Sequence, residues 1–407
     1  MTSGTAQRAT EARGAAKFRT AAVVLLLTAG LGALIYLGWY SYQMYRPGMR
    51  YYLKGLTAMD QHHPLAARKY WQAGIKADPR FWRNYEKLGQ FYAAALHYRV
   101  AGKYLLQATA FNPNDGNLQL EFSKVAHKAG RLDLSHKAGL AAVRLMPHNV
   151  VALGDYGLQL VEAHHRMEAV SYLKRAAAIK ILPEYYIPMV SAEMDNGDMQ
   201  QAQADLTTYL KLYPDDYQAL ILMASVYKAK PHTVDNMNMV LKYALHAGRV
   251  NPYVVNPYVL IGQVLVAANQ PAKALKFFVG GLNIQPNNDT ILYGLIQCYG
   301  MLGNTKARAI VLAHYNQVLK WKNTAAHLAD RMPYDPQNLS ALLKLANLEE
   351  ILDHDQKALT YYKLAVIAAP KNSTVRSKAI AFCNRHDLPK LASELKRPGY
   401  LPYIEPQ

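Results

Sequence analysis

Apolar and small residues recur along most of this chain at helical spacing, in paired stretches separated by short polar turns. The clearest markers are prolines that follow alanine-rich stretches: Pro79, Pro113 and Pro147 lie 34 residues apart each time. Between the first two prolines, small and large residues follow an order that recurs in other units, namely Tyr85, Leu88, Gly89, Tyr92, Ala101, Leu105 and Ala108. This order predicts two helices per unit, with small residues where the helices cross and larger ones between units.

The same order continues through nine units, from about residue 49 to residue 370. It is still clear in the seventh unit, at Tyr258, Gly262, Leu265, Ala274, Phe278, Gly281 and Pro286. The pattern resembles the tetratricopeptide repeat (TPR). The resemblance implies an all-α fold, an α-solenoid in the form of a right-handed superhelix of about nine helix pairs over residues 46–370. One pair cannot bury its apolar face alone, so stacking of neighbouring pairs stabilises such an array.

Two units depart from the period. The sixth, which ends at Pro252, is four residues too long, and we expect the additional residues near KAKPHTVDN, between its helices. The eighth keeps its first helix but runs about fifty residues to Pro336, so its second helix is extended or followed by an extra turn. Residues 371–407 are expected to hold a capping helix, STVRSKAIAFCNRHD, and a short proline-marked tail.

A long uncharged stretch precedes the repeats. Residues 21–45 carry no charge, and within them lie the roughly 20 apolar residues that a bilayer-spanning helix needs. A cleaved signal peptide is the alternative, but cleavage needs small residues, and the aromatic residues found here suit a membrane interface instead: Tyr36, Trp39, Tyr40, Tyr42 and Tyr45. Basic residues in the 1–20 tail favour a cytoplasmic N-terminus. We therefore expect a single-pass protein of the inner (plasma) membrane, with its repeats on the extracytoplasmic, or periplasmic, side.

The charge balance is basic, because 46 lysines and arginines stand against 28 acidic residues, a net charge of +18. The basic residues are dispersed, which favours a solvated surface over a nucleic-acid track. The two cysteines, Cys298 and Cys383, form no zinc-type motif with histidines. Neither a phosphate-binding loop nor a hydrolase or metalloprotease signature occurs in the sequence. These patterns indicate a protein that is not an enzyme and that uses no metal or other cofactor.

Candidate binding residues follow from the repeat frame. TPR arrays usually bind an extended peptide or a partner helix in a concave groove lined by the first helix of each pair. In the last five units the residue after the recurring glycine position is polar and uncharged: Ser191, Ser225, Gln263, Gln297 and Asn347. These side chains can hydrogen-bond the peptide groups of an extended ligand. Ordinary solvated helix surface is the alternative interpretation.

Three basic residues of earlier units, Arg83, Lys124 and Lys128, are expected to face the same groove. They could clamp an acidic side chain or a carboxylate, and the alternative is three exposed basic residues without a ligand. Some TPR proteins hold chaperone C-termini with a lysine on the first helix. That position is occupied here, in different units, by Tyr52, Glu86, Leu120, Ile221 or Val259, which argues against this mode of binding.

These features favour a membrane-anchored scaffold or adaptor that binds other proteins and assembles or escorts a bacterial envelope complex. A second hypothesis is an accessory subunit of a polysaccharide synthesis or export system, because 30 tyrosines against 8 phenylalanines could offer rings to sugars. A third is an anchored TPR receptor that faces the cytosol. Nucleic-acid binding draws only on the basic charge, and an extracytoplasmic domain would rarely meet such a ligand.

Overall fold

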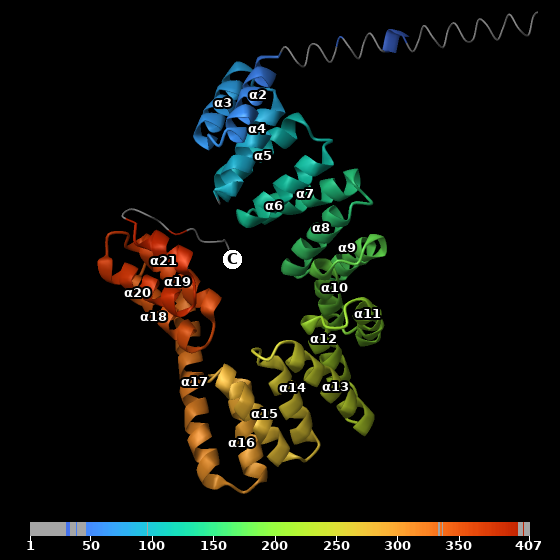
Figure 1. Cartoon of the computed structure of the whole chain (residues 1–407), viewed down its shortest axis with the longest axis vertical. Coiled ribbons are helices and arrows are strands. Elements are labelled where there is room, and N and C mark those ends of the chain that lie inside the picture. The colour runs from blue at the N-terminus through green and yellow to red at the C-terminus, as the bar shows by residue number, and fades with distance from the viewer. Residues whose placement is uncertain are drawn as a thin grey trace, which may run out of the picture. The chain divides into compact units, whose positions relative to one another are not determined.

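A computed structural model of the chain describes residues 30–32, 38, 46–95, 97–332, 334–335, 337–397 and 402. Throughout these residues the regular structure is helical, and the chain divides into two compact units, Met1–Met146 and Pro147–Gln407. Figure 1 shows each unit as a series of helices paired through tight turns, with α17 of the second unit longer than the others. The expected all-α class is therefore confirmed, whereas the superhelical sense of the array stays a prediction.

The first unit holds three helix pairs within the described residues. Their bounds are α2 Pro47–Asp60, α3 Pro64–Ala77, α4 Trp82–Ala94, α5 Tyr98–Phe111, α6 Gly116–Lys128 and α7 Leu132–Leu145. The first helices of these pairs begin at residues 47, 82 and 116, which follows the period read from the sequence. The buried cluster around Ala58, Ala67, Trp71 and Leu88 joins the first pair to the second.

The second unit continues the pairing. Its helices are α8 Val150–Glu162, α9 Arg166–Ile179, α10 Pro183–Asp195, α11 Met199–Leu212, α12 Tyr217–Lys228, α13 Val234–Val250, α14 Asn256–Ala267, α15 Pro271–Ile284, α16 Asp289–Met301, α17 Thr305–Arg331, α18 Leu339–Ile351, α19 Asp355–Ala368, α20 Ser373–Arg385 and α21 Pro389–Leu395. Over the described part of the chain, α2 to α19 make the nine predicted pairs in a TPR-like arrangement. A shorter tenth pair, α20 and α21, follows them.

The turn inside a pair has a recurring backbone form. A residue with positive φ lies in it, for example His62 at 59°, His164 at 61° and Gly197 at 89°. This left-handed conformation reverses the chain within three residues and ends the first helix. His62 and His164 lie in these turns, and both are exposed.

The glycine that recurs in the first helix allows a close helix crossing. A Cβ atom built on Gly262 in α14 would lie 2.5 Å from Cε1 of Phe278 in α15, and one on Gly89 in α4 would lie 2.5 Å from Cγ of Leu105 in α5. No side chain fits at such a separation, so the large residue of the second helix packs directly on the backbone of the first. Both Phe278 and Leu105 are fully buried.

The additional residues of the sixth unit are divided between a turn and a helix. The turn from α12 to α13 covers residues 229–233, and α13 has 17 residues where α11 and α15 have 14. Thr233 caps the longer helix, because its Oγ1 accepts a hydrogen bond from the backbone N–H of Asn236 at 3.2 Å. The expected position near KAKPHTVDN is confirmed, with the addition that the helix itself lengthens.

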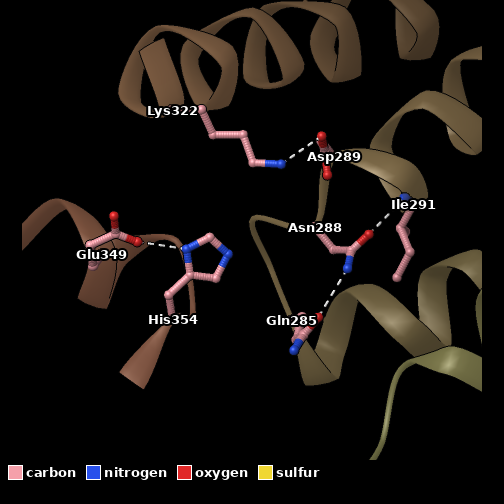
Figure 2. A network of polar contacts seen from close by, with 7 residues as sticks. All are labelled: Gln285, Asn288, Asp289, Ile291, Lys322, Glu349 and His354. Atoms are coloured by element: carbon pink, nitrogen blue, oxygen red, sulfur yellow. Dashed lines mark hydrogen bonds and ion pairs between the residues drawn. The ribbon is translucent and has the colours of Figure 1, made fainter. Parts of the chain in front are cut away.

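The eighth unit resolves the two alternatives left by the sequence, since α17 is one continuous helix of 27 residues. Figure 2 shows how α17 is fixed beside α16: Lys322 Nζ lies 2.7 Å from Oδ2 of Asp289, the first residue of α16. Val318 and Ala325 of α17 are buried in one cluster with Leu345 and Leu348 of α18. The extension thus supplies the surface on which the ninth pair packs.

The C-terminal segment folds as a helix pair rather than as the single capping helix expected. Asp387 adopts a positive φ of 52°, and Pro389 then begins α21. Ala392 and Leu395 of α21 are buried against the last apolar face, in a cluster that includes Phe382 of α20. Pro389 can start this helix because it lies at the first helical position, where its missing N–H is harmless.

The predicted membrane helix lies almost wholly outside the described residues, as do the five aromatic residues assigned to the membrane interface: Tyr36, Trp39, Tyr40, Tyr42 and Tyr45. Among the residues that the structure does describe, none of the helices is both long enough and apolar enough to cross a bilayer. The anchor therefore stays a prediction from the sequence.

Candidate functional site

The five polar residues predicted to line a groove all lie in the second unit, one on the first helix of each successive pair. Ser191 lies on α10, Ser225 on α12, Gln263 on α14, Gln297 on α16 and Asn347 on α18. We call them the polar row. Gln297 and Asn347 are exposed, whereas the other three are half-buried. Their equivalent positions in five consecutive pairs give the row its regularity.

Two members of the polar row already make contacts within the protein. Ser225 Oγ donates to the carbonyl oxygen of Ile221 on its own helix at 2.9 Å. Gln263 accepts a hydrogen bond at Oε1 from Nζ of Lys228, which lies on the preceding first helix. This hydrogen bond holds the Lys228 side chain against the surface of α14, where burial lowers its pKa. A ligand at this end of the row would therefore meet Lys228 together with Gln263.

A second row accompanies the first, and sequence reasoning missed it. Four residues before each member of the polar row, on the same helix face, stands an apolar or aromatic residue: Ile187, Ile221, Val259, Tyr293 and Leu343. We call these the apolar row. Tyr293 is 51% exposed, Ile187 is buried and the others are half-buried. From the sequence, Ile221 and Val259 were noted only as positions that lack a lysine. The recurrence of apolar residues at this position was therefore not recognised.

The two rows together define what this face can bind. Amides and hydroxyls accept and donate hydrogen bonds without regard to ligand sequence, while the apolar row offers contact area to side chains. The only strongly exposed aromatic ring of the two rows, Tyr293, lies 6.2 Å from the ring of Tyr315 on α17, measured between centroids. The face is suited to an extended polypeptide or an amphipathic helix.

The three basic candidates lie in the first unit, Arg83 on α4 and the pair Lys124 and Lys128 on α6, and all three are exposed. The Arg83 guanidinium stacks over the Trp82 ring at 5.2 Å, and Lys128 Nζ lies 5.3 Å from the centre of the Tyr98 ring. Aromatic rings therefore stabilise two of the three cations.

Carboxylates lie close to these cations. Gln90 Nε2 on α4 donates to Oε2 of Glu121 on α6 at 2.9 Å, and Lys87 Nζ donates to Oε1 of Gln90 at 2.8 Å. Burial raises the pKa of both Glu86 and Glu121. Positive charge from Arg83 on Glu86 and from Lys124 on Glu121 opposes that rise. An acidic ligand on this face would have to compete with two carboxylates of the protein itself.

The tyrosines that motivated a carbohydrate hypothesis are largely structural in the described residues. Tyr156 and Tyr209 are fully buried, and Tyr186 stacks on Tyr209 at 5.0 Å between ring centres. Their positions between helices explain why tyrosine is frequent, since the ring fills the gap and the hydroxyl reaches a polar partner. Tyr209 Oη, for example, donates to Oδ2 of Asp216 at 2.8 Å.

In the described part of the chain, no three histidine, cysteine or acidic side chains are grouped so as to hold a metal ion. The polar clusters that do occur join neighbouring helices. Lys174 on α9, for instance, lies 2.6 Å from Oε1 of the fully buried Glu193 on α10.

Comparison with known proteins assigns no family by sequence, because no family model matches the chain and no curated protein does. Solved structures show partial likeness. YrrB, described as a TPR protein with an unusual peptide-binding site, is 15% identical, with 46% of this chain and 96% of YrrB covered at a TM-score of 0.40.

A tetratricopeptide repeat protein from Parabacteroides merdae is 14% identical, with 62% and 99% of the two chains covered at a TM-score of 0.42. PilW, described as a type IV pilus biogenesis factor, is 14% identical, with 57% and 98% covered at a TM-score of 0.40. These are partial matches between helical repeat arrays, and they assign no ligand to this chain.

Proposed function

We propose that this protein is a membrane-anchored TPR scaffold that binds other proteins through the first-helix face of its second unit. The observation that carries the proposal is the pair of rows. Five consecutive first helices present a polar uncharged residue at one position and an apolar or aromatic residue one turn earlier. Ile187 is buried in the core and Ile221, Val259 and Leu343 pack partly against it, so a polypeptide would contact the exposed parts of these three side chains together with the ring of Tyr293.

The partner is a polypeptide rather than a small molecule. The rows extend over five helix pairs and offer uncharged hydrogen-bonding groups, which suit the regularly spaced peptide groups of an extended ligand. The ammonium group of Lys228 lies beside Gln263 and favours a ligand that carries an acidic group at this point.

The apolar, uncharged stretch at residues 21–40 supports membrane anchoring, and basic residues before it support a cytoplasmic N-terminus with the repeats outside. In this arrangement the protein assembles or escorts a complex of the cell envelope. A topology reporter fused after Gln407 tests the orientation. We expect an extracytoplasmic signal, and a cytoplasmic signal would support the alternative of a receptor that faces the cytosol.

The binding function is tested with the full-length protein in detergent. Chemical crosslinking in membranes followed by mass spectrometry identifies partners, and their affinity is then measured against variants. Tyr293→Arg and Gln297→Arg place bulk and charge on the two rows and are expected to weaken binding at least about tenfold, or 1.4 kcal/mol.

The matched control is Gln356→Arg, an exposed glutamine on the second helix α19. It adds the same side chain outside both rows and is expected to leave affinity unchanged. Equal effects of all three substitutions, or none, would contradict binding at the rows. Retention of a glycan and no protein would support the polysaccharide hypothesis instead.

A further inference from the structure

A second groove of the second unit lies between the second helices α13 and α15. Its walls are α13 and α15 and its floor is α14, and it encloses about 560 Å³. The lining is mainly apolar and includes Met237, Leu241, Leu245, Val264, Leu265 and Phe277. Val264 and Leu265 follow Gln263 of the polar row on α14, but no residue of the two rows is among those that line the groove.

The longer helix α13 builds this groove. Its additional residues at the N-terminus carry Val234, which lines the groove and is 69% exposed. Besides the Thr233 cap, Asn236 Nδ2 donates to the carbonyl oxygen of Pro231 at 2.8 Å. These two contacts hold the first turn of α13 in place, so the wall is a built feature and not a frayed end.

The apolar side chains along the α13 wall are exposed enough to meet a partner. Leu245 is 44% exposed, and with Val234, Met237 and Leu241 it forms one helical stripe spaced by three or four residues. Such a stripe normally packs against another helix. Here part of it faces solvent across the groove, a feature typical of an interaction surface.

The charge around the groove selects the kind of partner. Residues 217–288 contain six basic residues and a single acidic one, Asp235. Lys273 lines the groove from α15 and is exposed. Lys242 follows Leu241 on one wall, Lys276 precedes Phe277 on the other, and both are exposed. Apolar walls with Lys273 in the lining, and with Lys242 and Lys276 next to lining residues, complement a helix that is apolar on one side and acidic on its flanks.

We propose that the groove between α13 and α15 binds an acidic amphipathic helix of another protein, independently of the two rows. A second copy of this chain is a poor occupant, because its net charge of +18 would repel the basic rims. The apolar residues of the ligand lie at helical spacing on the α14 floor, and its carboxylates pair with Lys242, Lys273 and Lys276. The surface thus gives the scaffold a second type of partner.

The test is a selection on immobilised full-length protein in detergent, with a displayed library of random peptides of about 16 residues, roughly four helical turns. Clones are counter-selected on the double variant Val234→Asp, Lys273→Glu. Both positions are exposed, so the fold should tolerate the changes. We expect clones that distinguish the two proteins to carry net negative charge and apolar residues spaced by three or four.

The affinities of the selected peptides, made synthetically, are then measured against variants of the groove and of the polar row to show which of the two surfaces binds them. Leu245→Asp or Lys273→Glu should weaken binding at least about tenfold, and raising salt from about 50 to 500 mM should weaken it further because exposed charges are screened. Gln297→Arg in the polar row should leave it unchanged. The proposal is overturned if discriminating peptides are neutral or basic, if none is found, or if Gln297→Arg alone abolishes binding. It is likewise overturned if the same substitutions abolish only binding to anionic lipid vesicles.

Discussion

Asn287, in the turn between α15 and α16, donates a hydrogen bond from Nδ2 to the carbonyl oxygen of Ile351 at 2.8 Å, across 64 residues of sequence. Its Oδ1 lies 2.9 Å from Nε2 of His314 on α17. One side chain thus joins the seventh pair to the end of α18, past the long helix that interrupts the period. In a regular array each pair contacts its neighbours, so this hydrogen bond from the end of the seventh pair to the ninth is an additional contact, made past the long helix of the eighth.

Replacement of Asn287 by Ala is expected to destabilise the C-terminal pairs selectively. Two hydrogen bonds are lost and the Ile351 carbonyl is left without this donor, which costs on the order of 1–3 kcal/mol. Hydrogen exchange should show faster amide exchange in α18 and α19, with α10 to α12 unchanged. The control is Asn283→Ala on α15, an exposed asparagine, which should change neither. A uniform loss of protection over the whole second unit would contradict the local role.

The buried carboxyl of Glu193 is expected to make the stability of the protein depend on pH. Burial raises its pKa to about 7, although the ammonium of Lys174 opposes the rise. A raised pKa in the folded state means that the folded protein binds more protons than the unfolded one. Its favourable contribution is fully present below the unfolded pKa of about 4.3 and is lost as pH rises through 7.

Substitution of Glu193 by Gln should therefore raise the free energy of unfolding at pH 8 by about 1 kcal/mol or more. The gain should shrink as pH falls and be nearly gone at pH 4, just below the unfolded pKa of about 4.3, where the carboxyl is protonated in the folded state and largely protonated in the unfolded state. Denaturant unfolding of the variant and the unsubstituted protein at the high and the low pH measures this difference in the free energy of unfolding. Glu184→Gln, an exposed glutamate on the same helix, is the control and should show no such pH dependence. A loss of stability at pH 8 would mean that the ion pair with Lys174 outweighs the burial.

Gly262 and Gly300 make a matched pair for the role of close packing. A Cβ on Gly262 would lie 2.5 Å from Cε1 of Phe278, whereas one on Gly300 of α16 would lie 3.7 Å from Nε of Arg308. Gly262→Ala is expected to destabilise the protein by about 1–3 kcal/mol through overpacking. Gly300→Ala should be neutral or stabilise by up to about 1 kcal/mol, because alanine favours helix.

Thermal unfolding of the two glycine variants measures the difference. The double variant Gly262→Ala, Phe278→Leu should recover part of the loss, since the smaller side chain makes room for the methyl group. If Gly262→Ala is as well tolerated as Gly300→Ala, the close crossing of α14 and α15 is not what holds this pair together.

Much of the fold was predictable because the repeat imposes physical constraints at fixed positions. A glycine opposite Phe278 or Leu105 is needed wherever helices cross closely, and this requirement recurs visibly in the sequence. The continuity of α17 was also readable, since no proline or glycine interrupts residues 305–331. It was harder to predict how the additional residues of the sixth unit divide between the turn and α13, because the length of the unit gives their number but not their positions.

The candidate site was predictable only in part. The polar row follows from the frame, and the apolar row would have followed from a count of residues four positions earlier. The pairing of Glu193 with Lys174 had no such signal, because the lysine comes from the second helix of the preceding pair. The carboxylates near Arg83 and Lys124 were visible in the sequence, yet their contacts depend on how α4 and α6 pack.

The most direct test of the proposed scaffold is site-specific photocrosslinking in intact membranes, with a photoreactive residue at position 297 or, as the control, at position 356. We predict a discrete protein adduct from position 297 that is absent from position 356 and that disappears when Tyr293→Arg is added. Equal adducts at both positions, or none at position 297, would contradict binding at the two rows.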